Sequence, residues 1–122
     1  MLCSLRAAAR ILPAVVIALS AGLARADEVA DFYRGRTLNL IAGFNVGGGA
    51  DAYARLVARY LGQHLPGNPT VVVRNMPGAG SMSAANHLFN VSPRDGSEIG
   101  LFAGNIAIDP VIGGVPSKFD AR

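Results

Sequence analysis

Two glycine-rich segments carry the residues whose types and spacing most clearly suggest a binding site. Residues 43–49 read GFNVGGG, and residues 75–81 read NMPGAGS. Each lies between an apolar run and a run with helical periodicity, so each is expected to join a strand to the start of a helix. The first turn of a helix has backbone N–H groups without partners, and the helix dipole makes that end attractive to anions. Two such loops predict one anion bound from two sides.

The first loop departs from the two best-known nucleotide-binding patterns. Gly43 and Gly48 have the spacing of a P-loop, but Gly49 and Ala50 stand where that motif has lysine and serine or threonine. The dinucleotide fingerprint GxGxxG is absent as well, because Phe44 follows Gly43. A nucleotide-hydrolysing enzyme is therefore not indicated. An anion-binding loop and a tight turn that needs glycine for steric reasons remain as alternatives.

Side chains with catalytic potential are sparse. His64 ends a predicted helix and His87 lies within another, and neither has a neighbour at the spacing of a metal ligand. The sequence has no GxSxG motif, and Ser81 has no evident partner base. We therefore expect no enzyme activity, no catalytic residue, no metal site and no cofactor. The alternative is a small secreted α/β enzyme that uses the glycine loops as an oxyanion site.

The distribution of charge argues against a nucleic-acid-binding protein. The chain has a formal net charge of +3, but three of its eleven basic residues, Arg6, Arg10 and Arg25, precede the first acidic residue, Asp27. The remaining eight basic residues are balanced by the eight acidic ones. A nucleic-acid-binding domain keeps its excess positive charge in the folded part, clustered on one face.

Residues 1–26 have the pattern of a secretory signal peptide. Arg6 and Arg10 precede an apolar run over 11–23, and a small-x-small pattern ends at Ala26. We expect cleavage after Ala26 and export of the mature chain. An uncleaved anchor is the alternative, although the apolar run is shorter than the roughly 20 residues that span a membrane comfortably.

The mature chain, residues 27–122, is long enough for one small domain. The only cysteine, Cys3, lies in the leader, so the mature chain would have neither a disulfide nor a thiol. Strands are predicted over 37–44, 70–74 and 97–103, helices over 50–65 and 81–89, and the start of a third helix over 105–112.

The alternation of strands and helices predicts the fold class. Each crossover is longer than a dozen residues, so the strands should be parallel and the fold an open, doubly wound α/β sheet. Both glycine loops then lie at the carboxyl edge of the sheet, where ligands usually bind. Three strands make a small sheet, so we expect the chain to be the front part of something longer.

One apolar stripe of the helix over 50–65 is predicted to face the core. Its members repeat at helical spacing and are Ala52, Tyr53, Leu56, Val57, Tyr60 and Leu61. Polar residues are predicted on the opposite side, where Asp51 and Arg55 form an i,i+4 pair; the others are Arg59 and Gln63. Ser81 is predicted to cap the next helix.

Three sequence segments, taken together, resemble a known family. The segments are FNVGGGADAYARLVARYL (44–61), PTVVVRNMPGAGSMSAANHLFNVSPRDG (69–96) and IGLFAGNIAIDP (99–110). Their order and spacing are similar to those of the substrate-binding receptors of tripartite tricarboxylate transporters, the Bug receptors. The resemblance covers about residues 33–122.

The resemblance implies both an architecture and a function. Residues 27–122 would be the truncated front part of domain 1 of a two-domain, periplasmic-binding-protein-like fold. The protein would be a periplasmic solute receptor that binds a small carboxylate and delivers it to the membrane permease subunits of the transporter. The present chain would supply one wall of the binding cleft.

The resemblance also implies a set of ligand-binding residues. They are Asn45, Val46, Gly47, Gly48, Gly49 and Asp51 at the first loop, Asn75, Gly78, Ala79, Gly80 and Ser81 at the second, and Gly104 and Asn105 after the third strand. Many relatives have prolines where this chain has Asn45 and Val46, so the resemblance does not specify which acid binds.

Overall fold

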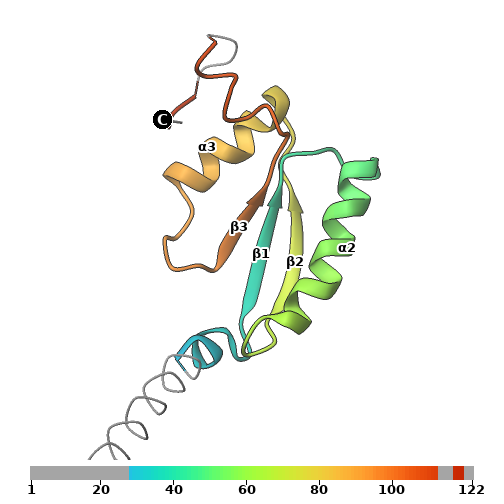
Figure 1. Cartoon of the computed structure of the whole chain (residues 1–122), viewed down its shortest axis with the longest axis vertical. Helices are drawn as coiled ribbons and strands as arrows, with labels where there is room; N and C mark the ends of the chain where they lie inside the picture. Colours follow the sequence, from blue (N-terminus) through green and yellow to red (C-terminus); the bar gives the residue numbers. More distant parts are fainter. Residues whose placement is uncertain (1–27, 113–116, 120–122) are drawn as a thin grey trace, which may run out of the picture.

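A computed structural model describes residues 28–112 and 117–119 of the chain, and the predicted leader lies outside these residues. The fold is a small α/β fold, as predicted (Figure 1). A short helix over 28–33 precedes the first strand. The elements that follow are β1 (Thr37–Ala42), α2 (Gly49–His64), β2 (Thr70–Asn75), the 3-10 helix η1 (Ala79–Ser81), α3 (Met82–Asn90) and β3 (Glu98–Leu101).

The three strands form one parallel sheet in the order β2-β1-β3. Thr37 of β1 pairs with Thr70 of β2, and Asn39 of β1 pairs with Glu98 of β3. The first strand in the sequence is therefore the central strand, and the chain reverses its direction of winding there. This parallel arrangement confirms the prediction made from the lengths of the crossovers.

The two main helices cover opposite faces of the sheet (Figure 1). Helix α2 packs on the face that carries Leu40 and Ala42. Helix α3 packs on the other face, where Leu88 approaches Gly100 of β3. Two crossovers that run in opposite directions across a sheet put their helices on opposite faces when both have the same hand.

Strand β1 supplies much of the core because both of its faces are covered. Leu38, Leu40, Ile41 and Ala42 are each at most 3% exposed. A strand that is buried on both faces has a continuous apolar sequence, whereas a strand with one exposed face alternates apolar and polar residues.

The predicted core-facing stripe of α2 is wrong for most of its members, although Val57 does pack against the core. The buried residues of this helix are Asp51, Ala54, Ala58 and Gly62, whereas Tyr53, Leu56 and Tyr60 are 58%, 52% and 51% exposed. Val57 and Leu61 of the predicted stripe are partly buried.

Close approach of α2 to the sheet explains this choice of face. A Cβ atom added to Gly62 would run into the carbonyl oxygen of Pro69, at the start of β2. A helix this near a strand can present only small residues to it, so the larger apolar side chains of α2 point elsewhere.

The third helix expected over 105–112 is also wrong. The segment forms successive turns instead, in which Ile108 donates a backbone hydrogen bond of 2.9 Å to Asn105 and Val111 donates one of 2.9 Å to Ile108. Pro110 has no N–H to donate and cannot continue a helical ladder. Farther along, the Lys118 amide donates a 2.7 Å hydrogen bond to the side chain of Asn86 on α3.

Candidate functional site

The carboxyl ends of all three strands meet at one edge of the sheet, because the strands are parallel (Figure 1). The two glycine loops and the segment after β3 leave the sheet at this edge, and they border a hollow of about 250 Å³. Its lining residues are Gly43, Phe44, Asn45, Pro77, Gly78, Ala79, Gly80, Ser81 and Ala103. The edge is the one at which open α/β sheets bind ligands.

The structure brings only part of the predicted ligand-binding set to this hollow. Asn45 and the second-loop residues 78–81 line it, whereas Val46 is 71% exposed and the glycines 47–49 are exposed without lining it. Gly104 and Asn105 lie in an exposed turn just beyond Ala103.

Four lining residues lie outside the predicted ligand-binding set: Gly43, Phe44, Pro77 and Ala103. Gly43 and Phe44 directly follow β1, Pro77 follows β2 by two residues, and Ala103 follows β3 by two. Proximity to a strand end was the signal that could have found them, since ligands bind beyond the carboxyl ends of parallel strands.

The second loop has an unusual backbone. Gly78, Ala79, Gly80 and Ser81 have φ angles of 138°, 45°, 62° and 79°, so four consecutive residues have positive φ. Ala79 and Ser81 are not glycines, and an L-residue with a Cβ atom is strained in this region. Strain of this kind persists only where the surrounding structure enforces it, and it is concentrated at binding and switch sites.

Ser81 is held in this conformation by two hydrogen bonds of its buried hydroxyl. The side chain is 2% exposed; its Oγ donates to the carbonyl oxygen of Gly43 at 3.0 Å and accepts from the amide of Ala103 at 3.1 Å. Ser81 occupies the N-cap position of α3 but makes no capping hydrogen bond with its side chain. The predicted capping role is therefore wrong, and the hydroxyl joins the ends of β1 and β3 instead.

Asp51, predicted on the exposed side of α2, is 3% exposed. Its carboxylate accepts hydrogen bonds from the Gly47 amide at 2.9 Å, from Arg55 Nε at 3.0 Å and from Asn75 Nδ2 at 2.8 Å. The predicted i,i+4 pair with Arg55 is confirmed.

Asn75 completes this network from β2. Its Nδ2 also donates to the carbonyl oxygen of Phe44 at 3.1 Å, and its Oδ1 accepts from the guanidinium of Arg55 at 3.2 Å. The side chains of Asp51 and Asn75 thus hold the first loop against the sheet, and their hydrogen-bond partners are protein groups rather than a ligand.

These hydrogen bonds also set the protonation state of Asp51. The side chain of Arg55, the backbone amide of Gly47 and the side chain of Asn75 hold the pKa of Asp51 at about 2, below its usual 3.8. Hydrogen bonds donated to a carboxylate favour its charged form. Asp51 is therefore ionised at neutral pH, and Arg55 balances its charge.

The start of α2 presents backbone donors at the carboxyl edge of the sheet, outside the lining of the hollow. Its N-cap residue, Gly48, makes no side-chain capping hydrogen bond, and the first backbone bond of the helix runs from the Ala52 amide to the Gly48 carbonyl at 2.9 Å. Within the described part of the chain, the amides of Gly49 and Ala50 have no acceptor. Such amides attract anions.

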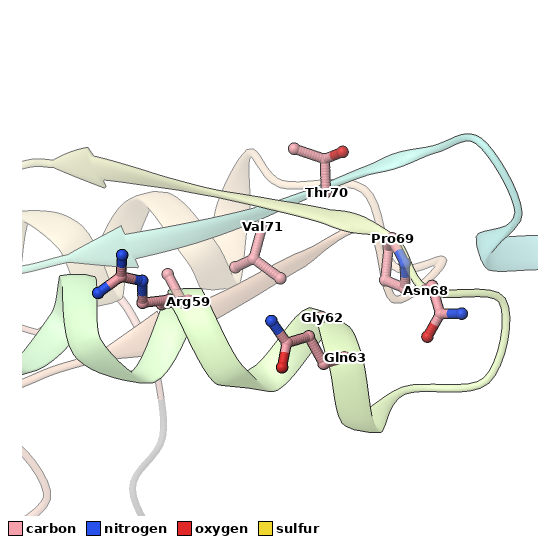
Figure 2. A pocket seen from close by; sticks show the side chains of 8 residues that line it. Arg59, Gly62, Gln63, Asn68, Pro69, Thr70 and Val71 are labelled. Carbon is pink, nitrogen blue, oxygen red and sulfur yellow. The ribbon is translucent and has the colours of Figure 1, made fainter.

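A second hollow, of about 450 Å³, lies between the last turns of α2 and the start of β2 (Figure 2). Arg59 is the one charged residue among its lining residues, which are Ala58, Arg59, Gly62, Gln63, Asn68, Pro69, Thr70 and Val71. This hollow is larger, but it lies at the amino end of β2 and contains no residue of the predicted site. We therefore place the candidate site at the carboxyl edge.

Neither histidine lies at the candidate site. His64 Nδ1 is 2.8 Å from the backbone oxygen of Tyr60, and His87 Nε2 is 3.9 Å from Glu98 Oε2. Over residues 28–112 and 117–119, no cluster of three or more His, Cys, Asp or Glu side chains could hold a metal ion. No helix in the same residues is long and apolar enough to cross a membrane.

Comparisons of the chain with protein-family models, with curated proteins and with solved structures find no match.

Proposed function

We propose that the chain is the ligand-contacting front part of a periplasmic solute receptor that binds a small carboxylate for a tripartite tricarboxylate transporter. The observation that supports this function best is the shared hollow at the carboxyl edge, which both glycine loops border. The resemblance of three segments to the Bug receptors supports the same function independently of the geometry.

The carboxylate is bound by backbone groups in this proposal. The amides of Gly49 and Ala50, which have no acceptor among the described residues, approach it from the first loop, and the strained segment 78–81 lines the hollow from the second. The negative charge of Asp51 repels a bound carboxylate only weakly, because Arg55 Nε lies 3.0 Å from the Asp51 carboxylate and balances its charge.

Exposed apolar residues on α2 and β2 suit a surface that other segments of the receptor cover. Tyr53, Leu56 and Tyr60 leave a half-exposed apolar stripe on α2, and Val72 of β2 is 41% exposed on the sheet face opposite α2. Exposed apolar surface often marks a contact with another protein segment, and in a two-domain receptor other segments of the same protein would provide that contact. In such a receptor the second domain closes the cleft, and the closed form delivers the ligand to the permease subunits.

The alternative, a secreted α/β enzyme with an oxyanion site, has less support. Among the described residues that line the hollow, Ser81 alone carries a hydroxyl, and its proton is donated to the Gly43 carbonyl rather than to a base. A serine nucleophile needs a base that accepts this proton.

Backbone amide shifts of the ¹⁵N-labelled chain test the proposed function. Acetate, succinate and citrate are titrated to millimolar concentrations, and acetamide serves as the uncharged counterpart of acetate. We expect the carboxylates, and not acetamide, to shift the amides of Gly49, Ala50 and residues 78–80. Gly35 and Gly67 precede β1 and β2 at the opposite edge and should not respond. Unchanged loop amides with all three acids would reject the proposal.

A further inference from the structure

We infer that Ser81 is a positioning residue: its hydroxyl holds the three strand ends around the hollow and gives nothing to a bound carboxylate. One buried oxygen contacts both neighbouring segments. Ser81 Oγ lies 3.0 Å from the Gly43 carbonyl oxygen and 3.1 Å from the Ala103 amide nitrogen. Ser81 itself belongs to the loop that follows β2.

The number of protons on the hydroxyl excludes it as a donor to ligand. A serine hydroxyl has one proton to donate and otherwise accepts. That proton is used on the Gly43 carbonyl, and the Ala103 amide occupies an acceptor position. An ionised carboxylate only accepts hydrogen bonds. Ser81 could donate a hydrogen bond to it only by breaking its own hydrogen bond to the Gly43 carbonyl.

The two hydrogen bonds of the Ser81 hydroxyl, to Gly43 and from Ala103, form a bridge between the strand ends. This bridge requires glycine at position 43 as well as serine at position 81. A Cβ atom added to Gly43 would collide with the side chain of Ser81, so the β1 end can approach Ser81 only because residue 43 is glycine. Ser81 is 2% exposed and Gly43 is buried, so water does not easily replace the two hydrogen bonds. A buried carbonyl or amide that loses its partner is costly, which stabilises the bridge once it forms.

The backbone conformation of Ser81 does not explain why this residue is a serine. Its φ angle of 79° would suit glycine better than serine. Glycine could satisfy the turn, so the property that serine adds is the bridging hydroxyl. Ser81→Gly therefore removes the bridge while relieving the backbone strain, and it is the variant most suited to keep the fold.

Hydrogen exchange of single amides tests the bridge in the full chain. We expect Ser81→Gly and Ser81→Ala to lower the exchange protection of the Ala103 amide, relative to Leu40 at the sheet centre, by about tenfold, the effect of losing one hydrogen bond. Ser83→Ala removes an exposed hydroxyl two residues away and should leave this ratio unchanged. Unchanged Ala103 protection in Ser81→Gly would overturn the inference, and so would an equal loss in Ser83→Ala.

Acetate titration of the same variants tests the consequence for binding, which rests on the proposed function. If acetate shifts the loop amides of the unmodified chain, we expect these shifts to need at least several-fold more acetate in Ser81→Gly, because the loops are no longer held together. Equal responses in both chains, with Ala103 protection lost, would show that the bridge does not position the site. No response in the unmodified chain would reject the proposed function, while Ala103 protection would still decide whether the bridge exists.

Discussion

Asn75 donates a hydrogen bond of 2.8 Å to the carboxylate of Asp51, although the two residues are 24 positions apart and lie on different elements. Asp51 is in the first turn of α2, and Asn75 is the last residue of β2. The bond therefore joins the start of the helix to the end of the edge strand, and the first glycine loop is held between them. A polar pair therefore helps to fix the position of this loop, together with the packing of Phe44 against the core.

The Asp51 network should make the protein sensitive to acid. The folded-state pKa of about 2 is below the usual 3.8, so the unfolded chain takes up a proton first as the pH falls. The stabilisation is complete above about pH 4 and is lost as the pH falls toward about 2. We expect the urea midpoint to fall over this range, as measured by circular dichroism.

Two variants identify the source of this acid response. Asp51→Asn should lower the urea midpoint at pH 7 and flatten its dependence on pH. Some dependence should remain, because hydrogen bonds from Ser97 also lower the pKa of Asp95. Asp31→Asn alters an exposed pair with Arg34 and is the matched control, with little effect expected at pH 7. An equally steep acid response in Asp51→Asn would show that Asp51 is not its source.

Substitutions on α2 should distinguish its buried face from its exposed one. Ala54 is 0% exposed, so Ala54→Leu overpacks the contact with the sheet and should cost about 1–3 kcal/mol of unfolding free energy. Leu56 is 52% exposed, and Leu56→Ala should change the unfolding free energy by about 0.5 kcal/mol or less. Urea denaturation measures both, and the reverse ranking would restore the apolar stripe predicted from the sequence.

The strained second loop should respond oppositely to two adjacent substitutions. Ala79 has φ of 45°, and Ala79→Gly should stabilise the fold by about 0.5 kcal/mol, since the strain relieved exceeds the added entropy of the unfolded chain. Gly80 has φ of 62°, and Gly80→Ala should destabilise it by about 1 kcal/mol. Thermal unfolding followed by calorimetry would measure both; a stabilising Gly80→Ala would contradict the left-handed geometry.

Export should remove the leader after Ala26. Alanines at positions 24 and 26 provide the small residues that signal peptidase requires. Intact-mass spectrometry of the exported protein should identify Asp27 as its first residue, and Ala26→Tyr should block or shift the cleavage. Recovery of exported protein that still contains Cys3 would favour an uncleaved anchor.

The sequence was sufficient to predict the three strands, the two main helices and their order, but not the turns that replace the expected third helix over 105–112. Strand β1 is an apolar run and β2 is rich in β-branched residues, and the long crossovers between strands exclude antiparallel hairpins. These features depend on the local chain and on covalent geometry, so no tertiary information was needed. The three strands and the helices α2 and α3 accordingly fall within a few residues of their predicted positions.

The face of α2 and the role of Ser81 could not be predicted in the same way. Hydrophobicity selects Tyr53 and Tyr60 for the core, but the distance between helix and sheet selects Ala54, Ala58 and Gly62. That distance is set by the close contact of Gly62 with Pro69, which only the folded structure shows. Likewise, the partners of the Ser81 hydroxyl are 38 and 22 residues away, so no local pattern indicates them.

The central position of β1 has a consequence for the order in which the protein can fold. This strand is synthesised first, but its second edge stays unpaired until β3, about 60 residues later, is complete. Helix α2 and β2 can cover Leu40 before then, but Ile41, on the opposite face of β1, has no lasting cover, so the growing chain exposes part of an apolar strand. Pairing over such separations slows folding and lengthens this exposure. We therefore expect chaperones that bind nascent chains to recognise residues 37–42 until Leu101 has emerged from the ribosome or the export channel.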